Sequence, residues 1–206
     1  MEKKGKWLIL WLLSILLLSG CTGATTQTTK HSTTKAINSA DTASILHSSQ
    51  AIAPLWGHRT KTSHCHIQGS LPDPACTPGN IMPGATADTV CVPGYTRTVR
   101  NVSVSTKNRV YAEYGITQRS PGQYQIDHFI SLGSGGANDI SNLWPQPATP
   151  LPGYHEKDRL ERYLYTLVCN DQMSLKDAQI QMATNWVAAY QAIPKNWVAD
   201  TSKDPD

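Results

Sequence analysis

The hydrophobic residues of this chain follow a different spacing in each of its segments. Residues 7–18 are almost continuously apolar, whereas residues 22–54 are rich in Thr and Ser and contain no Phe, Trp or Tyr. Apolar residues recur at helical spacing in two later stretches. This pattern predicts one helix over residues 155–169 and a second that begins at a Ser174 cap and ends before Pro194.

The middle of the chain carries patterns typical of strands and turns. An apolar run over residues 123–132 predicts a strand, the glycines of 133–136 allow a turn, and residues 138–146 supply a loop and a return strand. The fold class predicted from these elements is α+β. Upstream we expect an irregular lead-in over residues 57–94, extended chain over 95–102, and a short helix from Lys107 to Tyr114 capped by Ser105.

The N-terminal apolar run has the features of an export signal. Lysines precede it, it is shorter than the ~20 residues that span a bilayer, and it ends in Leu18-Ser-Gly-Cys21. That ending resembles the lipobox of bacterial lipoproteins, which implies cleavage before Cys21 and acylation of its sulfur. We therefore interpret residues 1–20 as a lipoprotein signal peptide, with an uncleaved anchor or an ordinary signal peptide as the alternative. The expected location is the bacterial cell envelope, and the outer membrane if the host is Gram-negative, because Thr22 rather than an aspartate follows the cysteine.

Composition divides the rest of the chain into a tether and one domain. Residues 21–54 cannot bury enough apolar surface to offset their ordering entropy, so we expect a disordered leash. Residues 55–198 suit a single domain with one core, followed by an acidic tail over 199–206.

Charge gives only weak evidence about partners. The formal net charge is +3, but residues 1–50 hold five of the 18 Lys and Arg residues and two of the 15 Asp and Glu residues, so the remainder is neutral. This balance disfavours a tight, non-specific DNA binder. Residues 95–126 form either a local basic surface or an ordinary solvated one, since only Glu113 opposes their five basic side chains: Arg97, Arg100, Lys107, Arg109 and Arg119.

The cysteines indicate an oxidising compartment. Apart from Cys21, the chain has Cys65, Cys76, Cys91 and Cys169, an even set that is typical of two disulfides in an exported protein. The sequence leaves three pairings open, and we favour Cys65–Cys76, which closes a local loop, together with Cys91–Cys169. The alternative is a metal cluster that includes the neighbouring His58, His64 and His66, but no Cys-x-x-Cys spacing supports it.

The candidate chemistry is concentrated in residues 124–146. Asp127 and His128 are adjacent in the predicted strand, so their side chains point to opposite faces unless the strand end twists or both share a metal. The glycines that follow let Asn142 approach the strand and bond to the backbone across the loop. His155 begins the next helix, where an imidazole can ligate a metal held between strand and helix.

These pieces together resemble the HNH family of His-Me finger endonucleases. The resemblance covers about residues 92–186, and its motifs are Ile126-Asp-His128, Gly135-Gly136, Asn138-Asp-Ile-Ser-Asn142-Leu-Trp-Pro-Gln146 and Lys157-Asp-Arg-Leu-Glu161. It implies a ββα-metal motif inside a small disulfide-stapled domain with two C-terminal helices. The chain departs from the family's pattern in the long, proline-rich spacing between Asn142 and His155 and in lacking the zinc-binding cysteine pairs.

The resemblance also implies roles for individual residues. His128 matches the general base, Asn142 the loop-stabilising Asn, and Asp127 a metal ligand, with His155 as the candidate second ligand. The expected cofactor is a divalent metal, Mg²⁺ or a similar ion such as Mn²⁺, which would stabilise the phosphorane and the leaving oxygen. Arg159 or Lys157 could hold a non-bridging phosphate oxygen, although for Lys157 we favour a surface ion pair with Glu156 or Glu161.

The predicted function is a membrane-tethered endonuclease with little sequence specificity, acting on DNA with RNA as a further substrate. The first alternative is a non-catalytic envelope lipoprotein that uses an HNH-like scaffold for binding. The second is a hydrolase of another phosphodiester or a different metal enzyme. The sequence does not determine the oligomeric state.

The lipoprotein interpretation makes the first testable prediction. Wild-type chain expressed in bacteria should incorporate labelled palmitate and fractionate with membranes, because acylation needs the Cys21 thiol. A Cys21→Ser variant should remain an unlabelled precursor. Unlabelled wild-type protein found free in the medium would show that the interpretation is wrong.

Overall fold

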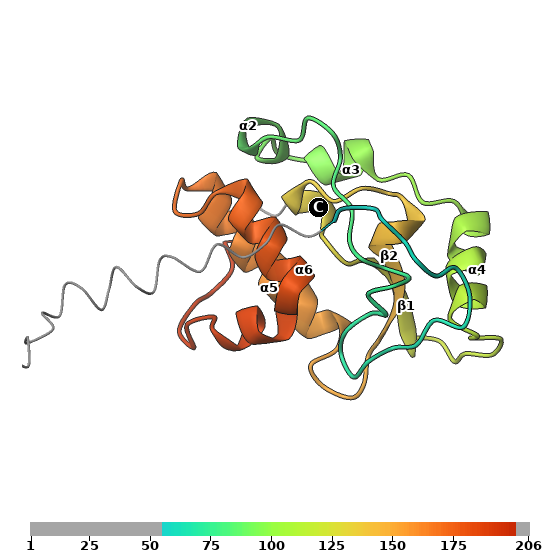
Figure 1. Cartoon of the computed structure of the whole chain (residues 1–206). Helices are drawn as coiled ribbons and strands as arrows, with labels where there is room; N and C mark the ends of the chain where they lie inside the picture. The colour runs from blue at the N-terminus through green and yellow to red at the C-terminus, as the bar shows by residue number, and fades with distance from the viewer. Residues whose placement is uncertain (1–54, 201–206) are drawn as a thin grey trace, which may run out of the picture. The chain divides into compact units, whose positions relative to one another are not determined.

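A two-stranded antiparallel sheet lies at the centre of the domain (Figure 1). Strand β1, Tyr124–His128, pairs with strand β2, Leu143–Pro147, in a register that sets Asp127 opposite Trp144 and His128 opposite Leu143. The computed structural model describes residues 55–200. The predicted signal peptide, Cys21, the tether and residues 201–206 of the acidic tail lie outside the described residues.

Two long helices pack side by side against this sheet region (Figure 1). Helix α5 spans Tyr154–Cys169, and helix α6 spans Leu175–Gln191 with a non-helical residue at Asn185. The Ser174 side chain accepts a hydrogen bond from the Asp177 N–H, which is the N-cap that the sequence predicts. Mixed α+β architecture is therefore confirmed.

The upstream helices differ from the sequence prediction. Residues 95–102 were expected to be extended, but helix α3 spans Tyr95–Val99 after Gly94 takes a left-handed backbone conformation at its N-cap. Helix α4 spans Val104–Glu113, so it begins earlier than predicted, and Ser103 rather than Ser105 caps it. A short helix α2, Ala87–Val90, also interrupts the lead-in that was expected to be irregular.

The segment between the two strands is a buried loop. It contains two short 3₁₀ helices, η1 at Leu132–Ser134 and η2 at Ile140–Asn142, and residues 129–137 are all buried. Gly136 allows the loop to close on the end of β1, because a Cβ atom there would lie 1.8 Å from the Ile130 carbonyl oxygen. The predicted strand is accordingly shorter, ending at His128 rather than at residue 132.

One hydrophobic cluster joins the sheet to the helices. Its largest fully buried members are Trp144 from β2, Leu160 and Leu164 from α5, and Met182 and Trp186 from α6. The apolar faces predicted for α5 and α6 are thus core. Within the described part of the chain, no helix is long and apolar enough to span a bilayer.

One disulfide closes a loop within the lead-in, and a second ties the lead-in to helix α5. Cys65 is bonded to Cys76, and Cys91 is bonded to Cys169 at the end of α5. The favoured pairing is confirmed, and the alternative metal cluster at the cysteines is wrong. The Cys91–Cys169 bond spans 78 residues of sequence, so it closes most of the domain.

Loss of the long-range disulfide should destabilise the domain. A Cys91→Ser/Cys169→Ser variant should lose about 2–4 kcal/mol of unfolding free energy, because the unfolded chain gains loop entropy. Urea denaturation followed by tryptophan fluorescence measures the change against wild type. A variant that unfolds at the wild-type midpoint, or a free Cys169 thiol in mass mapping of unreduced wild-type peptides, would contradict the role assigned to this bond.

Candidate functional site

His128 lies at the end of β1 just beneath the protein surface. Its side chain is only 5% exposed, and its Nε2 lies 3.1 Å from Oδ1 of the half-buried Asn138. Burial lowers the pKa of His128 to about 4, against the opposing effects of the Asp127 charge and the Asn138 hydrogen bond. The imidazole is therefore neutral at pH 7 and can accept a proton there.

Asn142 fixes the loop that covers His128. Its amide nitrogen donates to the carbonyl oxygens of Ile130 and Ala137, both at 2.9 Å, and its Oδ1 accepts from the Ile130 N–H at 2.9 Å. The same oxygen accepts from the Asn80 N–H at 3.3 Å. These contacts are the cross-loop hydrogen bonds that the sequence predicts for this residue, while its participation in catalysis stays a prediction.

Asp127 is paired with a lysine from α5. The Lys157 ammonium donates to Asp127 Oδ2 at 2.7 Å, to the His128 carbonyl oxygen at 2.7 Å, and to Glu161 Oε1. Its three donors are thus satisfied although the side chain is 0% exposed. The sequence favoured a surface ion pair of Lys157 with Glu156 or Glu161; the pair with Glu161 is present, but the Lys157 side chain is fully buried.

Acidic neighbours stabilise the charged form of Lys157. Burial alone would lower the pKa of Lys157, but the negative charges of Asp127 and Glu161 raise it above its usual range. Burial raises the pKa of Glu161 and of Asp158, and the charge of Asp127 adds to both shifts. Lys157 therefore stays charged at neutral pH, paired with the Asp127 carboxylate.

His155 and Arg159 lie on another face of α5. Each is two residues from Lys157, which places it roughly 200° around the helix, and both are exposed. The His155 ring packs on Tyr154 with ring centroids 4.4 Å apart. The Arg159 guanidinium donates to the Trp197 carbonyl oxygen at 3.0 Å. The contacts seen for these two side chains are therefore with Tyr154 and Trp197 rather than with Asp127 or His128.

The two residues predicted as metal ligands, Asp127 and His155, lie in different surroundings. Asp127 is neutralised by the Lys157 ammonium, which occupies the place of a cation beside its carboxylate. His155 projects from a different face of α5 from the one that meets Asp127. Among residues 55–200, no group of three or more His, Cys, Asp or Glu side chains is placed to hold a metal ion. The divalent cofactor and its predicted ligands, Asp127 and His155, therefore stay predictions.

Two residues without a role predicted from the sequence act on His128. Asn138 contacts its imidazole, and the positive charge of Arg100 acts on its pKa. Arg100 belongs to the basic stretch noted in the sequence. Arg109 pairs with Glu113 at 3.0 Å, and Arg119 lies 3.8 Å above the Tyr111 ring. The sequence alone does not show that Arg100, among these basic residues, acts on His128.

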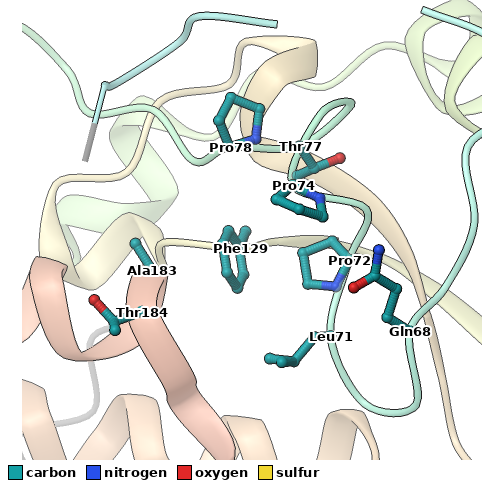
Figure 2. Close-up of a pocket in the computed structure, with 9 residues that line it drawn as sticks. All are labelled: Gln68, Leu71, Pro72, Pro74, Thr77, Pro78, Phe129, Ala183 and Thr184. Carbon is teal, nitrogen blue, oxygen red and sulfur yellow. The ribbon is translucent and has the colours of Figure 1, made fainter. Parts of the chain in front are cut away.

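A separate apolar pocket of about 180 Å³ adjoins the residue after His128 (Figure 2). Phe129 lies between prolines of the lead-in on one side and residues of α6 on the other. His128 does not line this pocket, since adjacent strand residues point to opposite faces. The lining residues are Gln68, Leu71, Pro72, Pro74, Thr77, Pro78, Phe129, Ala183 and Thr184.

Comparison with known proteins gives no further assignment. No protein-family model, no curated protein and no solved structure matches this chain.

Removal of the buried ammonium should strongly destabilise the domain. Lys157→Met keeps the length of the side chain but leaves the Asp127 carboxylate without its cation, so the unfolding free energy should fall by about 3–5 kcal/mol. Urea denaturation measures this loss. Lys176→Met, at an exposed position of α6, is the matched control and should change stability by no more than about 0.5 kcal/mol. Equal effects of the two substitutions would show that the ion-pair cluster does not support the fold.

Proposed function

We propose that this protein is a membrane-tethered endonuclease of the HNH type that hydrolyses phosphodiester bonds, with His128 as the general base. The observation that carries the proposal is a neutral imidazole at the end of β1, hydrogen-bonded to Asn138 in the loop and within the electrostatic influence of Arg100. The order of strand, loop, strand and helix around it supports the resemblance stated from the sequence. DNA is the proposed substrate, with RNA as a second one. The lipid anchor rests on Cys21 and remains a prediction from the sequence.

The reaction needs few of the chain's own groups. His128 takes a proton from a water molecule, whose oxygen attacks phosphorus while the bond to the leaving oxygen breaks. Arg100 replaces Arg159 as the proposed cation for the phosphate, because its charge already acts on His128. Lys157 holds the strand end that carries the base, since its ammonium binds the His128 carbonyl oxygen.

A second candidate function is binding without catalysis. Two observations favour it: the His128 side chain is 5% exposed, and the Asp127 carboxylate is engaged by Lys157. A protein that keeps this scaffold for binding in the cell envelope would show both features. A cleavage assay separates the two functions.

The catalytic proposal predicts that a single side chain controls the rate. His128→Ala should lower cleavage of plasmid DNA by about 10²–10⁴-fold, because a positioned base contributes that much. The full-length chain, purified in detergent, is assayed by gel electrophoresis on plasmid DNA and on RNA. Parallel reactions contain Mg²⁺, Mn²⁺ or a chelator, and loss of cleavage in chelator would establish the need for a metal. His58→Ala, in the exposed lead-in, is the matched control and should keep wild-type activity.

The outcomes separate the hypotheses. Equal cleavage by His128→Ala and wild type would show that the assigned base is wrong. Absence of cleavage by wild type under every metal condition would favour the binding scaffold.

Because the pKa of His128 is about 4, protonation of this base should not yet limit activity at pH 5.5, where an ordinary histidine is mostly protonated.

A further inference from the structure

The orientation of the Asn138 side-chain amide is fixed by two backbone groups. Its Nδ2 donates to the Val99 carbonyl oxygen at 2.7 Å, and its Oδ1 accepts from the Asn101 N–H at 3.1 Å. An amide nitrogen can only donate and an amide oxygen can only accept. If the amide were rotated by 180°, its oxygen would face the Val99 carbonyl oxygen, and its NH₂ group would face the Asn101 N–H. The hydrogen bonds therefore assign the oxygen to one side of the amide.

This assigned oxygen is the atom that faces His128. Oδ1 of Asn138 lies 3.1 Å from His128 Nε2, and an amide oxygen carries no proton to share. The proton of this hydrogen bond must therefore belong to Nε2. A neutral imidazole has one N–H, so the remaining lone pair is on Nδ1.

We propose that Asn138 is a positioning residue that holds His128 in the Nε2–H tautomer, so that Nδ1 is the atom that accepts the proton in catalysis. This inference rests on the proposed function for its catalytic half, whereas the tautomer is a property of the folded chain alone. Asn138 acts through His128 and has no assigned contact with the substrate.

The surrounding loop makes Asn138 a rigid partner. The Ala137 carbonyl accepts from Asn142 at 2.9 Å, and the Ala137 N–H donates to the Asn80 carbonyl at 3.0 Å. The residue before Asn138 is thus held on both of its polar backbone groups. Asn142 fixes the loop, and the hydrogen bond with Asn138 in that loop then holds the His128 imidazole in place.

A purely structural role for Asn138 would give a different result. If Asn138 only linked the loop to residues 99–101, its removal would lower the stability of the domain. It would not change which ring nitrogen of His128 carries the proton. Two variants separate these roles. Asn138→Leu has a similar shape but no acceptor, whereas Asn138→Asp keeps an acceptor oxygen for Nε2–H and so should retain the tautomer.

The decisive measurement is the nitrogen spectrum of the His128 ring. Full-length chain labelled with ¹⁵N-histidine is studied at pH 7 by long-range ¹H–¹⁵N correlation, and the His128 signals are those absent from a His128→Gln variant. Wild type and Asn138→Asp should show a protonated Nε2 and an unprotonated Nδ1. Asn138→Leu should show a mixture of tautomers, and Asn108→Leu, at an exposed position of α4, should match wild type.

Kinetics test the catalytic half. For Asn138→Leu, kcat should fall about 10- to 100-fold, below the loss caused by removal of the base itself, with KM little changed. Asn138→Asp should recover part of that loss. A protonated Nδ1 in wild type would overturn the proposal even if no variant folds, and so would an unchanged tautomer in Asn138→Leu. A wild-type chain with the expected tautomer but no cleavage would instead overturn the proposed function.

Discussion

The buried ammonium group of Lys157 is the interaction on which the rest of the site depends. It joins α5 to the end of β1 by binding a side chain and a backbone carbonyl of two consecutive strand residues, Asp127 and His128. A buried charge costs several kcal/mol unless it is paired and fully hydrogen-bonded, and here all three donors have acceptors. The position of the strand end relative to the helix is therefore specified by charge as well as by packing.

Because side chains alternate along β1, Asp127 and His128 have different surroundings and different roles. Asp127 points towards α5 and supports the structure, whereas His128 reaches Asn138 in the loop on the other side. The sequence already posed this problem, because a regular strand cannot direct adjacent residues to one place. The strand is regular up to His128, so the Asp127 and His128 side chains leave it on opposite faces.

Features set by neighbouring residues were predictable from the sequence, whereas features set by tertiary contacts were not. The helices over 155–169 and from Ser174 were predictable because spacing and caps are local. The disulfide pairing was favoured, among three possible pairings, because Cys65 and Cys76 lie close in sequence. The helix over Tyr95–Val99 was missed, since its start depends on a left-handed glycine that composition does not reveal. The burial of Lys157 was missed because a lysine beside two acidic residues looks like a surface residue, and only the tertiary position of Asp127 explains it.

The same limit applies to Asn138, which the sequence analysis quoted only as part of a motif. Its importance comes from contacts with Val99 and Asn101, which lie nearly 40 residues away in the chain. Metal ligation by Asp127 and His155 was predicted from the order of residues and stays a prediction. His155 and Lys157 are neighbours in sequence and yet face different environments.

The buried loop between the strands also determines where this chain can vary in length. Connections between strands usually lie on the surface and accept extra residues readily. Residues 129–137 instead fill the interior, and Gly136 touches the backbone of Ile130 so closely that even a methyl group has no room. The exposed segment 117–123, just before β1, has no such restriction. Insertions, epitope tags and permuted termini therefore belong in 117–123, and the hairpin connection must keep its length.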